Sequence, residues 1–161
     1  MFRMLVVALV ALSVAGPAVS AEKEHLQKAQ ELAKICATHL LKPNAIKENL
    51  KERDFRYEGV WGDTHFYSLD GRRLLAGTSR TSDKVKSCLV AVSKMTLNEA
   101  ASIAAPLAKA LKAKEFKSKD YDKAYVSDPR GGYVYAVTVE KHVNFRILRG
   151  AAITIIALPE G

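Results

Sequence analysis

The segment from Glu22 to Leu41 carries its apolar residues at alternating spacings of three and four. This period places them on one stripe, so we predict an amphipathic helix that packs against a hydrophobic core. The members of the stripe are Leu26, Ala29, Ala33, Cys36 and Leu40. The two histidines of the segment, His25 and His39, fall beside or off the stripe and are interpreted as surface residues.

A second, shorter helix is predicted directly after the first. Lys42 and Pro43 end the first helix, because the residue before a proline is displaced from helical geometry. Asn44 can then cap the new helix, and Ile46 and Leu50, four residues apart, lie on its apolar side.

Six later segments have the alternation or the β-branched and aromatic composition of strands. They span residues 55–61, 65–69, 72–78, 86–93, 133–140 and 144–158. The connections between the first four are short, and Asp70-Gly71 is a strong hairpin signal because both residues tolerate positive φ. These features favour an antiparallel meander. Residues 153–156 are apolar on both sides, which is typical of a central strand.

A third helix is predicted between the fourth and fifth of these strands. Thr96, with Glu99 three residues later, forms the capping-box pattern of a helix start. An apolar stripe then continues to Leu111, and Pro106 inside it is expected to kink or split the helix. The residues that follow are basic and then polar and aromatic, so no strand is predicted before residue 133.

The resulting order is α-α-β-β-β-β-α-β-β. It predicts an α+β protein with a single antiparallel sheet of about six strands and helices packed on one face. No internal repeat is visible in the sequence. Residues 22–161 have the size of one domain, so we expect a single α+β domain.

The N-terminus has the pattern of a secretory signal peptide. Arg3 supplies a positive start, residues 4–16 are apolar or small, and further small residues lead up to Ala21. We therefore predict a signal peptide over residues 1–21, export to the periplasm or the cell exterior, and a mature chain without a membrane span. An uncleaved anchor is less favoured, because a membrane-spanning helix needs about 20 apolar residues.

The chain has two cysteines, Cys36 and Cys88. An even number of cysteines in an exported protein most simply forms a disulfide. In the chain-entropy treatment, a loop of this length would contribute about 4 kcal/mol to stability. A reactive thiol is the alternative, but it needs an exposed, electropositive site, and both cysteines fall on apolar faces.

Positive charge is concentrated in the middle of the sequence. Residues 71–119 carry 11 Lys and Arg against 3 acidic residues, whereas residues 22–70 and 120–161 are close to neutral. A segregated basic segment indicates an anionic partner, with solubility as the alternative role. The candidate binding residues are Arg72, Arg73, Arg80, Lys84, Lys86, Lys109, Lys112, Lys114, Lys117 and Lys119.

Signals for catalysis are weaker than the charge pattern. The sequence has no zinc-type spacing, phosphate-binding loop, dinucleotide fingerprint or nucleophile elbow, so no metal and no cofactor are predicted. Asp63 and His65 share one side of a predicted strand, and Cys36 and His39 are three residues apart on a helix. These pairs support an alternative function as a small secreted hydrolase or thiol enzyme.

We therefore expect a small, exported, non-catalytic binding or accessory protein of the cell envelope. Its basic segment, residues 71–119, would engage an anionic partner, either an acidic protein or another anionic component of the envelope. Nucleic acid is a weaker candidate, because the aromatic residues that could stack on bases are expected to form the core of the sheet. These residues are Tyr57, Trp61, Phe66 and Tyr67.

Overall fold

The computed structural model describes residues 21–79, 85–145 and 148–160 of the chain. The predicted signal peptide therefore lies outside the described residues, apart from Ala21. Three helices and eight strands are present in the described part. They are α1 (Lys23–His39), α2 (Pro43–Glu52), β1 (Arg56–Trp61), β2 (Thr64–Leu69), β3 (Leu74–Ser79), β4 (Lys86–Val92), α3 (Leu97–Ala110), β5 (Ala113–Phe116), β6 (Lys123–Ser127), β7 (Tyr133–Phe145) and β8 (Leu148–Pro159).

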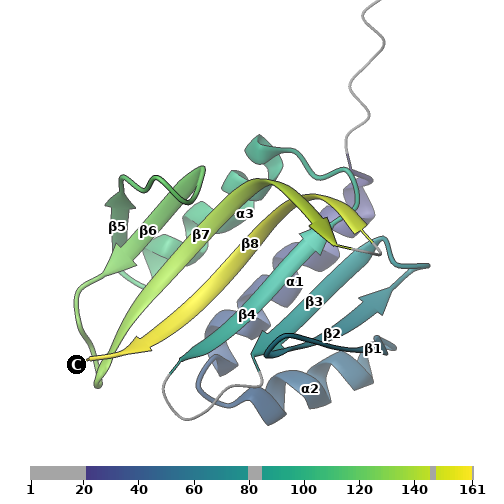
Figure 1. The fold of residues 1–161 in the computed structure, drawn as a ribbon, viewed down its shortest axis with the longest axis horizontal. Helices are drawn as coiled ribbons and strands as arrows, with labels where there is room; N and C mark the ends of the chain where they lie inside the picture. Colours follow the sequence, from purple (N-terminus) through teal and green to yellow (C-terminus); the bar gives the residue numbers. More distant parts are fainter. Residues whose placement is uncertain (1–20, 80–84, 146–147, 161) are drawn as a thin grey trace, which may run out of the picture.

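All eight strands form one antiparallel sheet in the order β1-β2-β3-β4-β8-β7-β6-β5 (Figure 1). The predicted α+β class with a single antiparallel sheet is therefore confirmed. Two meanders of four strands, β1–β4 and β5–β8, each follow helical structure and meet where β4 pairs with β8. The fold thus contains a topological repeat that the sequence does not reveal.

The prediction of about six strands is wrong, because β5 and β6 are also present. Ala113 and Glu115 face one side of β5, whereas Lys114 and Phe116 face the other. The alternation is therefore regular, but lysine occupies a position where a buried strand would carry an apolar residue. Edge strands are commonly charged in this way, since charge opposes pairing with other chains.

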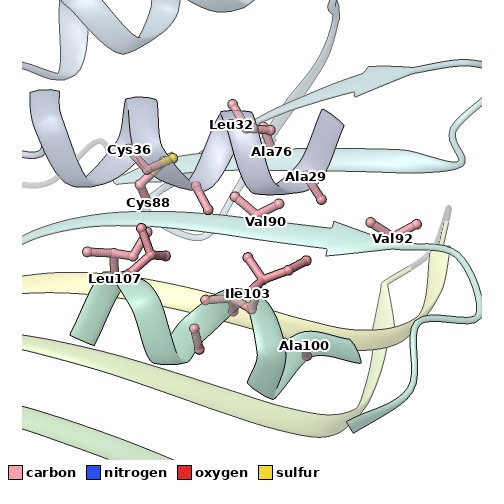
Figure 2. Packing of buried hydrophobic residues seen from close by; sticks show 14 of the residues in the cluster. Ala29, Leu32, Cys36, Ala76, Cys88, Val90, Val92, Ala100, Ile103 and Leu107 are labelled. Carbon is pink, nitrogen blue, oxygen red and sulfur yellow. A yellow bond between two sulfur atoms is a disulfide. The ribbon is translucent and has the colours of Figure 1, made fainter. Parts of the chain in front are cut away.

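Helices α1 and α3 lie behind the sheet in Figure 1 and cover one of its faces. Their apolar stripes interlock with side chains of the strands, as Figure 2 shows for Leu32 of α1, Ile103 of α3 and Val90 of β4. Helix α2 adds Ile46 and Leu50 to the same core. Burying one such side chain fully contributes about 1.5–3 kcal/mol. This packing confirms that helices cover one face of the sheet.

The predicted disulfide is confirmed, because Cys36 of α1 is bonded to Cys88 of β4. Their Cα atoms are 5.7 Å apart, within the usual range for a disulfide. Both residues are fully buried in the core between the helix and the sheet (Figure 2). The bond therefore fixes the first helix to a strand at the centre of the sheet.

The predictions made around two prolines are met only in part: α1 does end before Pro43, but Asn44 is not the cap of α2. Pro43 is the first residue of α2 and Lys42 is its N-cap, so Asn44 lies inside the first turn. Proline suits this position because its missing N–H would have no partner there. Pro106 lies within α3, which continues through it as one helix and is not split.

The connection from β4 to α3 passes very close to β8. Its predicted capping box is confirmed, with the Thr96 amide donating to Glu99 Oε2 at 2.8 Å. The Lys94 amide donates to the Arg149 carbonyl, and the Ala151 amide donates to the Met95 carbonyl. Between these two bonds, a Cβ on Gly150 would lie 2.4 Å from the Val92 carbonyl oxygen. Only glycine fits this approach without a backbone shift.

The opposite face of the sheet, here called the open face, carries no helix of the described chain (Figure 1). One row of paired residues crosses it from β5 to β2. In order, the row is Phe116, Ala124, Thr138, Thr154, Leu89, Gly77 and Phe66. An aromatic residue stands at each end of the row, and the residues between them are mostly small.

Candidate functional site

The structure divides the predicted basic residues between opposite ends of the sheet. Arg72 and Arg73 lie in the turn between β2 and β3, next to the β1 edge. Five lysines lie at the β5 edge, and we call them the lysine edge: Lys109, Lys112, Lys114, Lys117 and Lys119. Lys86 begins β4 and is half-buried, whereas Arg80 and Lys84 lie outside the described residues. The basic segment is therefore not one continuous surface.

The turn between β2 and β3 contains three successive residues in the left-handed region. Their φ angles are 52° for Asp70, 64° for Gly71 and 70° for Arg72. For the two non-glycine residues this conformation costs roughly 1–2 kcal/mol each. Such a cost persists only where surrounding contacts hold the backbone, and here ion pairs hold it from both faces of the sheet.

On the open face, Arg72 contacts the buried carboxylate of Glu58. Glu58 is the extra residue of a bulge in β1, and its side chain is only 6% exposed. Ser68 Oγ donates to its Oε1 at 2.6 Å, while Arg56 Nε and Arg72 Nη2 lie 3.3 and 3.2 Å from its oxygens. The Ser68 hydrogen bond, followed by the two arginines, holds the pKa of Glu58 below its usual value. Glu58 is therefore ionised at neutral pH and cannot serve there as a general acid.

These residues line a concavity of about 390 Å³ at the β1 end of the open face. Asp54 and Asp70 stand beside Arg56 and Arg72 in its lining. The charges of the concavity are therefore mixed, and its two arginines are already paired with Glu58. It does not provide an unneutralised positive surface.

On the helix side of the turn, Asp70 Oδ2 lies 2.8 Å from Lys28 Nζ and 3.3 Å from His25 Nε2. Glu22 completes the network, with contacts to His25 Nδ1 at 3.3 Å and to Arg73 Nη1 at 2.9 Å. His25 is buried between the two carboxylates, so its interpretation as a surface residue is wrong. The hydrogen bond between Lys28 and Asp70 lowers the pKa of the Asp70 carboxyl group and raises the pKa of the Lys28 ammonium group.

Arg72 and Arg73 thus connect the turn to β1 and to the start of α1, respectively. Their guanidinium groups are committed to carboxylates of the same chain. An external anion would have to compete with these internal partners. This arrangement favours a structural role for the two arginines, and it leaves the lysine edge as the better candidate for binding.

The lysine edge extends from the last turn of α3 through β5 into the loop before β6. All five lysines are exposed. Lys114 Nζ lies 3.9 Å from Asp128 Oδ2, and the described residues contain no other carboxylate paired with this group of lysines. Glu115 is the only acidic residue between Lys109 and Lys119, and it faces the other side of β5 from Lys114, while Asp120 and Asp122 follow in the loop. The edge therefore carries an excess of positive charge, with one ion pair to a carboxylate among the described residues.

The structure removes the thiol from the enzyme alternative and places the ring of His65 at an edge of the sheet. Cys36 has no free thiol, because it is bonded to Cys88. The ring of His65 lies at the β1–β2 edge, where its Nδ1 is 3.0 Å from the Tyr57 hydroxyl. Among the described residues, no three His, Cys, Asp or Glu side chains come together in a way that could hold a metal ion.

Comparison with protein-family models, curated proteins and solved structures finds no match to this chain. No relative therefore assigns a role to either charged region. Within the described ranges, none of the helices combines the length and the apolar character needed to cross a membrane.

Proposed function

We propose that this chain is an exported, non-catalytic binding protein of the cell envelope that engages an anionic partner through the lysine edge. The observation that carries the proposal is the set of five exposed lysines, for which the described residues supply one carboxylate partner, Asp128 at 3.9 Å from Lys114. Two other predicted binding residues, Arg72 and Arg73, differ from them because both are held in internal ion pairs.

The physical basis is electrostatic attraction at an exposed surface. Charges of one sign concentrated in a small region raise the local concentration of an oppositely charged partner and speed association. Salt screens exposed charges over about 8 Å at physiological ionic strength, so binding by this surface should weaken steeply as salt is added. A buried disulfide is typical of an oxidising compartment, which supports export.

The alternative role for these lysines is protection of the sheet edge. A charged edge strand resists pairing with other chains, which would keep the protein monomeric and in solution without any partner. The two roles differ in what a reversal of charge does: it should abolish capture of a partner in the first case and leave capture unchanged in the second.

The experiment is capture of envelope components on immobilised residues 22–161 at low and high salt. The test variant carries Lys114→Glu, Lys117→Glu and Lys119→Glu. A matched control carries Lys34→Glu, Lys42→Glu and Lys51→Glu, which make the same change in net charge at exposed positions on and between the first two helices. We expect the wild type and the control to retain an anionic partner at low salt, and the test variant to lose it.

Two results would contradict this proposal. Equal capture by the test variant and the wild type would assign the lysine edge to edge protection. Equal loss in the test variant and the control would show that overall charge, and not this surface, attracts the partner.

The proposed export of the protein can be tested separately from binding. The full chain, expressed in a cell with a secretory pathway, should appear outside the cytoplasm with its first 21 residues removed and without free thiols. An intact N-terminus in a cytoplasmic fraction would contradict the proposed location.

A further inference from the structure

We propose that the anionic partner of the lysine edge is a lipid surface and that Phe116 inserts into its interface between the lysines. This inference rests on the proposed function and names the chemical class of the partner. It is drawn from one aromatic side chain whose exposure the fold of the protein does not explain.

Phe116 is the last residue of β5 and is 58% exposed. It shares the open face with Lys114, and Lys117 follows it directly in the chain. Its cross-strand partner is Ala124, whose methyl group is too small to enclose the Phe116 ring. The structure gives Phe116 no ring contact with another described aromatic residue. A large apolar side chain is therefore held at the edge of the molecule, among positive charges.

This combination suits a membrane interface. Aromatic side chains favour the headgroup level of a bilayer, where the apolar ring leaves water while charged neighbours stay hydrated. Lysines close to an anionic leaflet strengthen binding by roughly fivefold each. Their long stems also let the ammonium groups reach headgroups while the ring lies deeper.

An acidic protein partner would require a different kind of surface at the same edge. A stable protein interface buries about 1,200–2,000 Å² and needs complementary shape around its central aromatic residues. Edge strand β5 is only four residues long, and its open face leads onto Ala124 and Thr138 in the neighbouring strands. A fluid surface needs no pocket around Phe116, so the lipid partner fits these residues better.

The nearby acidic residues, including Asp120 directly after Lys119, offset only part of the charge of the edge. Residues 109–119 contain five lysines and one glutamate, and that glutamate faces away from Phe116. Asp128 lies 3.9 Å from Lys114. This ion pair is weak, so a lipid phosphate can take the place of the Asp128 carboxylate. One carboxylate oxygen of Asp122 accepts a hydrogen bond of 2.6 Å from the Lys141 amide, which holds it toward β7.

The experiment is co-sedimentation of residues 22–161 with vesicles of mixed phosphatidylglycerol and phosphatidylcholine, compared with vesicles of phosphatidylcholine alone. We expect binding to the anionic vesicles only. Phe116→Ser should weaken that binding about tenfold, since the ring no longer leaves water. The control Leu41→Ser removes another exposed apolar side chain, 41% exposed and in the connection between α1 and α2, and should leave binding unchanged.

A second readout reports the depth of the side chain. Phe116→Trp should give a blue-shifted emission with anionic vesicles, measured as the difference from wild type because Trp61 also emits. Thermal unfolding of each variant checks that the fold is kept, which we expect because Phe116 packs little against the core.

Each remaining outcome overturns part of the inference. Loss of binding in the Lys114→Glu, Lys117→Glu, Lys119→Glu variant, together with full binding by Phe116→Ser, would exclude insertion of the aromatic ring. Failure to bind anionic vesicles, combined with salt-sensitive capture of an acidic protein, would overturn the lipid partner and leave the proposed function in place. Failure in both assays would overturn the two together.

Discussion

The hydroxyl of Ser68 donates a 2.6 Å hydrogen bond to the carboxylate of Glu58 across the β1–β2 pair. The bond exists because a bulge in β1 turns the Glu58 side chain onto the open face, opposite Ser68. Strand β1 has a neighbour on one side only, so this contact and the two arginines that flank it help to fasten the edge of the sheet.

Removing the Ser68 hydroxyl should weaken this edge in a pH-dependent way. We expect Ser68→Ala to lower the free energy of unfolding at neutral pH by about 1.5–3 kcal/mol, the range for hydrogen bonds to charged groups. The folded-state pKa of Glu58 lies below its ordinary value of 4.5, so its contribution is present above that value and is lost as the pH falls through the folded pKa. Urea unfolding over a series of pH values measures both effects.

Glu140 should show the opposite pH dependence of stability in the same urea-unfolding experiments. Burial, and then the nearby charge of Asp122, raise the pKa of Glu140, so its contribution is complete below 4.5 and is lost as the pH rises through the folded pKa. The difference between Ser68→Ala and wild type should therefore shrink in acid, whereas Glu140→Gln should gain stability relative to wild type at neutral pH. A Ser68→Ala penalty that does not change with pH would contradict the ionised state of Glu58.

The disulfide should contribute strongly to stability. The double variant Cys36→Ala, Cys88→Ala is expected to lose about 4 kcal/mol of unfolding free energy, because its unfolded chain regains the freedom of a long loop. Thermal and urea unfolding measure the loss. A reductant should lower the stability of the wild type and leave the double variant unaffected. Equal sensitivity of the two proteins would mean that the bond does not stabilise the fold.

Gly150 should tolerate no side chain. Gly150→Ala would place a Cβ 2.4 Å from the Val92 carbonyl oxygen, which is backbone and cannot rotate away. We expect a loss of about 3 kcal/mol or more in urea unfolding. Gly62 has positive φ but open space around it, so Gly62→Ala should cost only about 1 kcal/mol. Similar losses at the two positions would show that space at Gly150 is not limiting.

The buried hydroxyl of Thr78 should be dispensable. Its Oγ1 is buried and has no hydrogen-bond partner in the described structure, although Thr78 lies in the core beside Cys88. Thr78→Val replaces a desolvated polar atom with a methyl group of similar size, so stability should be unchanged or rise by about 1 kcal/mol. Unfolding by urea tests this, and a clear loss of stability would indicate an ordered water bound to the hydroxyl.

Much of the fold could be predicted because local patterns determine it. The spacing of apolar residues located α1, the pair Thr96 and Glu99 located the start of α3, and the apolar run at residues 153–156 marked a central strand. Strand β5 could not be recognised because a short, charged edge strand lacks the hydrophobic signal of a core, and β6 because its apolar run is only three residues long. Their existence depends on the pairing of β5 with β6 and of β6 with β7, which local sequence does not record.

The charged residues also divide into those whose neighbours follow from local sequence and those whose partners depend on the fold. The lysines of residues 109–119 could be grouped from sequence, since neighbours in a short stretch stay neighbours in space. The partners of Arg72 and Arg73, in contrast, are Glu58 and Glu22, which only the folded chain brings close. Gly59, an isolated glycine inside a strand, was the one available sign of the bulge that places Glu58.

The position of β8 has a consequence for the order of folding. This strand comes last among the described elements, yet it lies between β4 and β7 at the middle of the sheet. The first meander pairs with the second only through this strand, and pairs such as Val90 with Ile153 close a long stretch of chain. Long-range pairing of this kind is slow to form, because loop entropy is lost before the contacts are gained. During synthesis the two groups of four strands therefore cannot form one continuous sheet until β8 has been made.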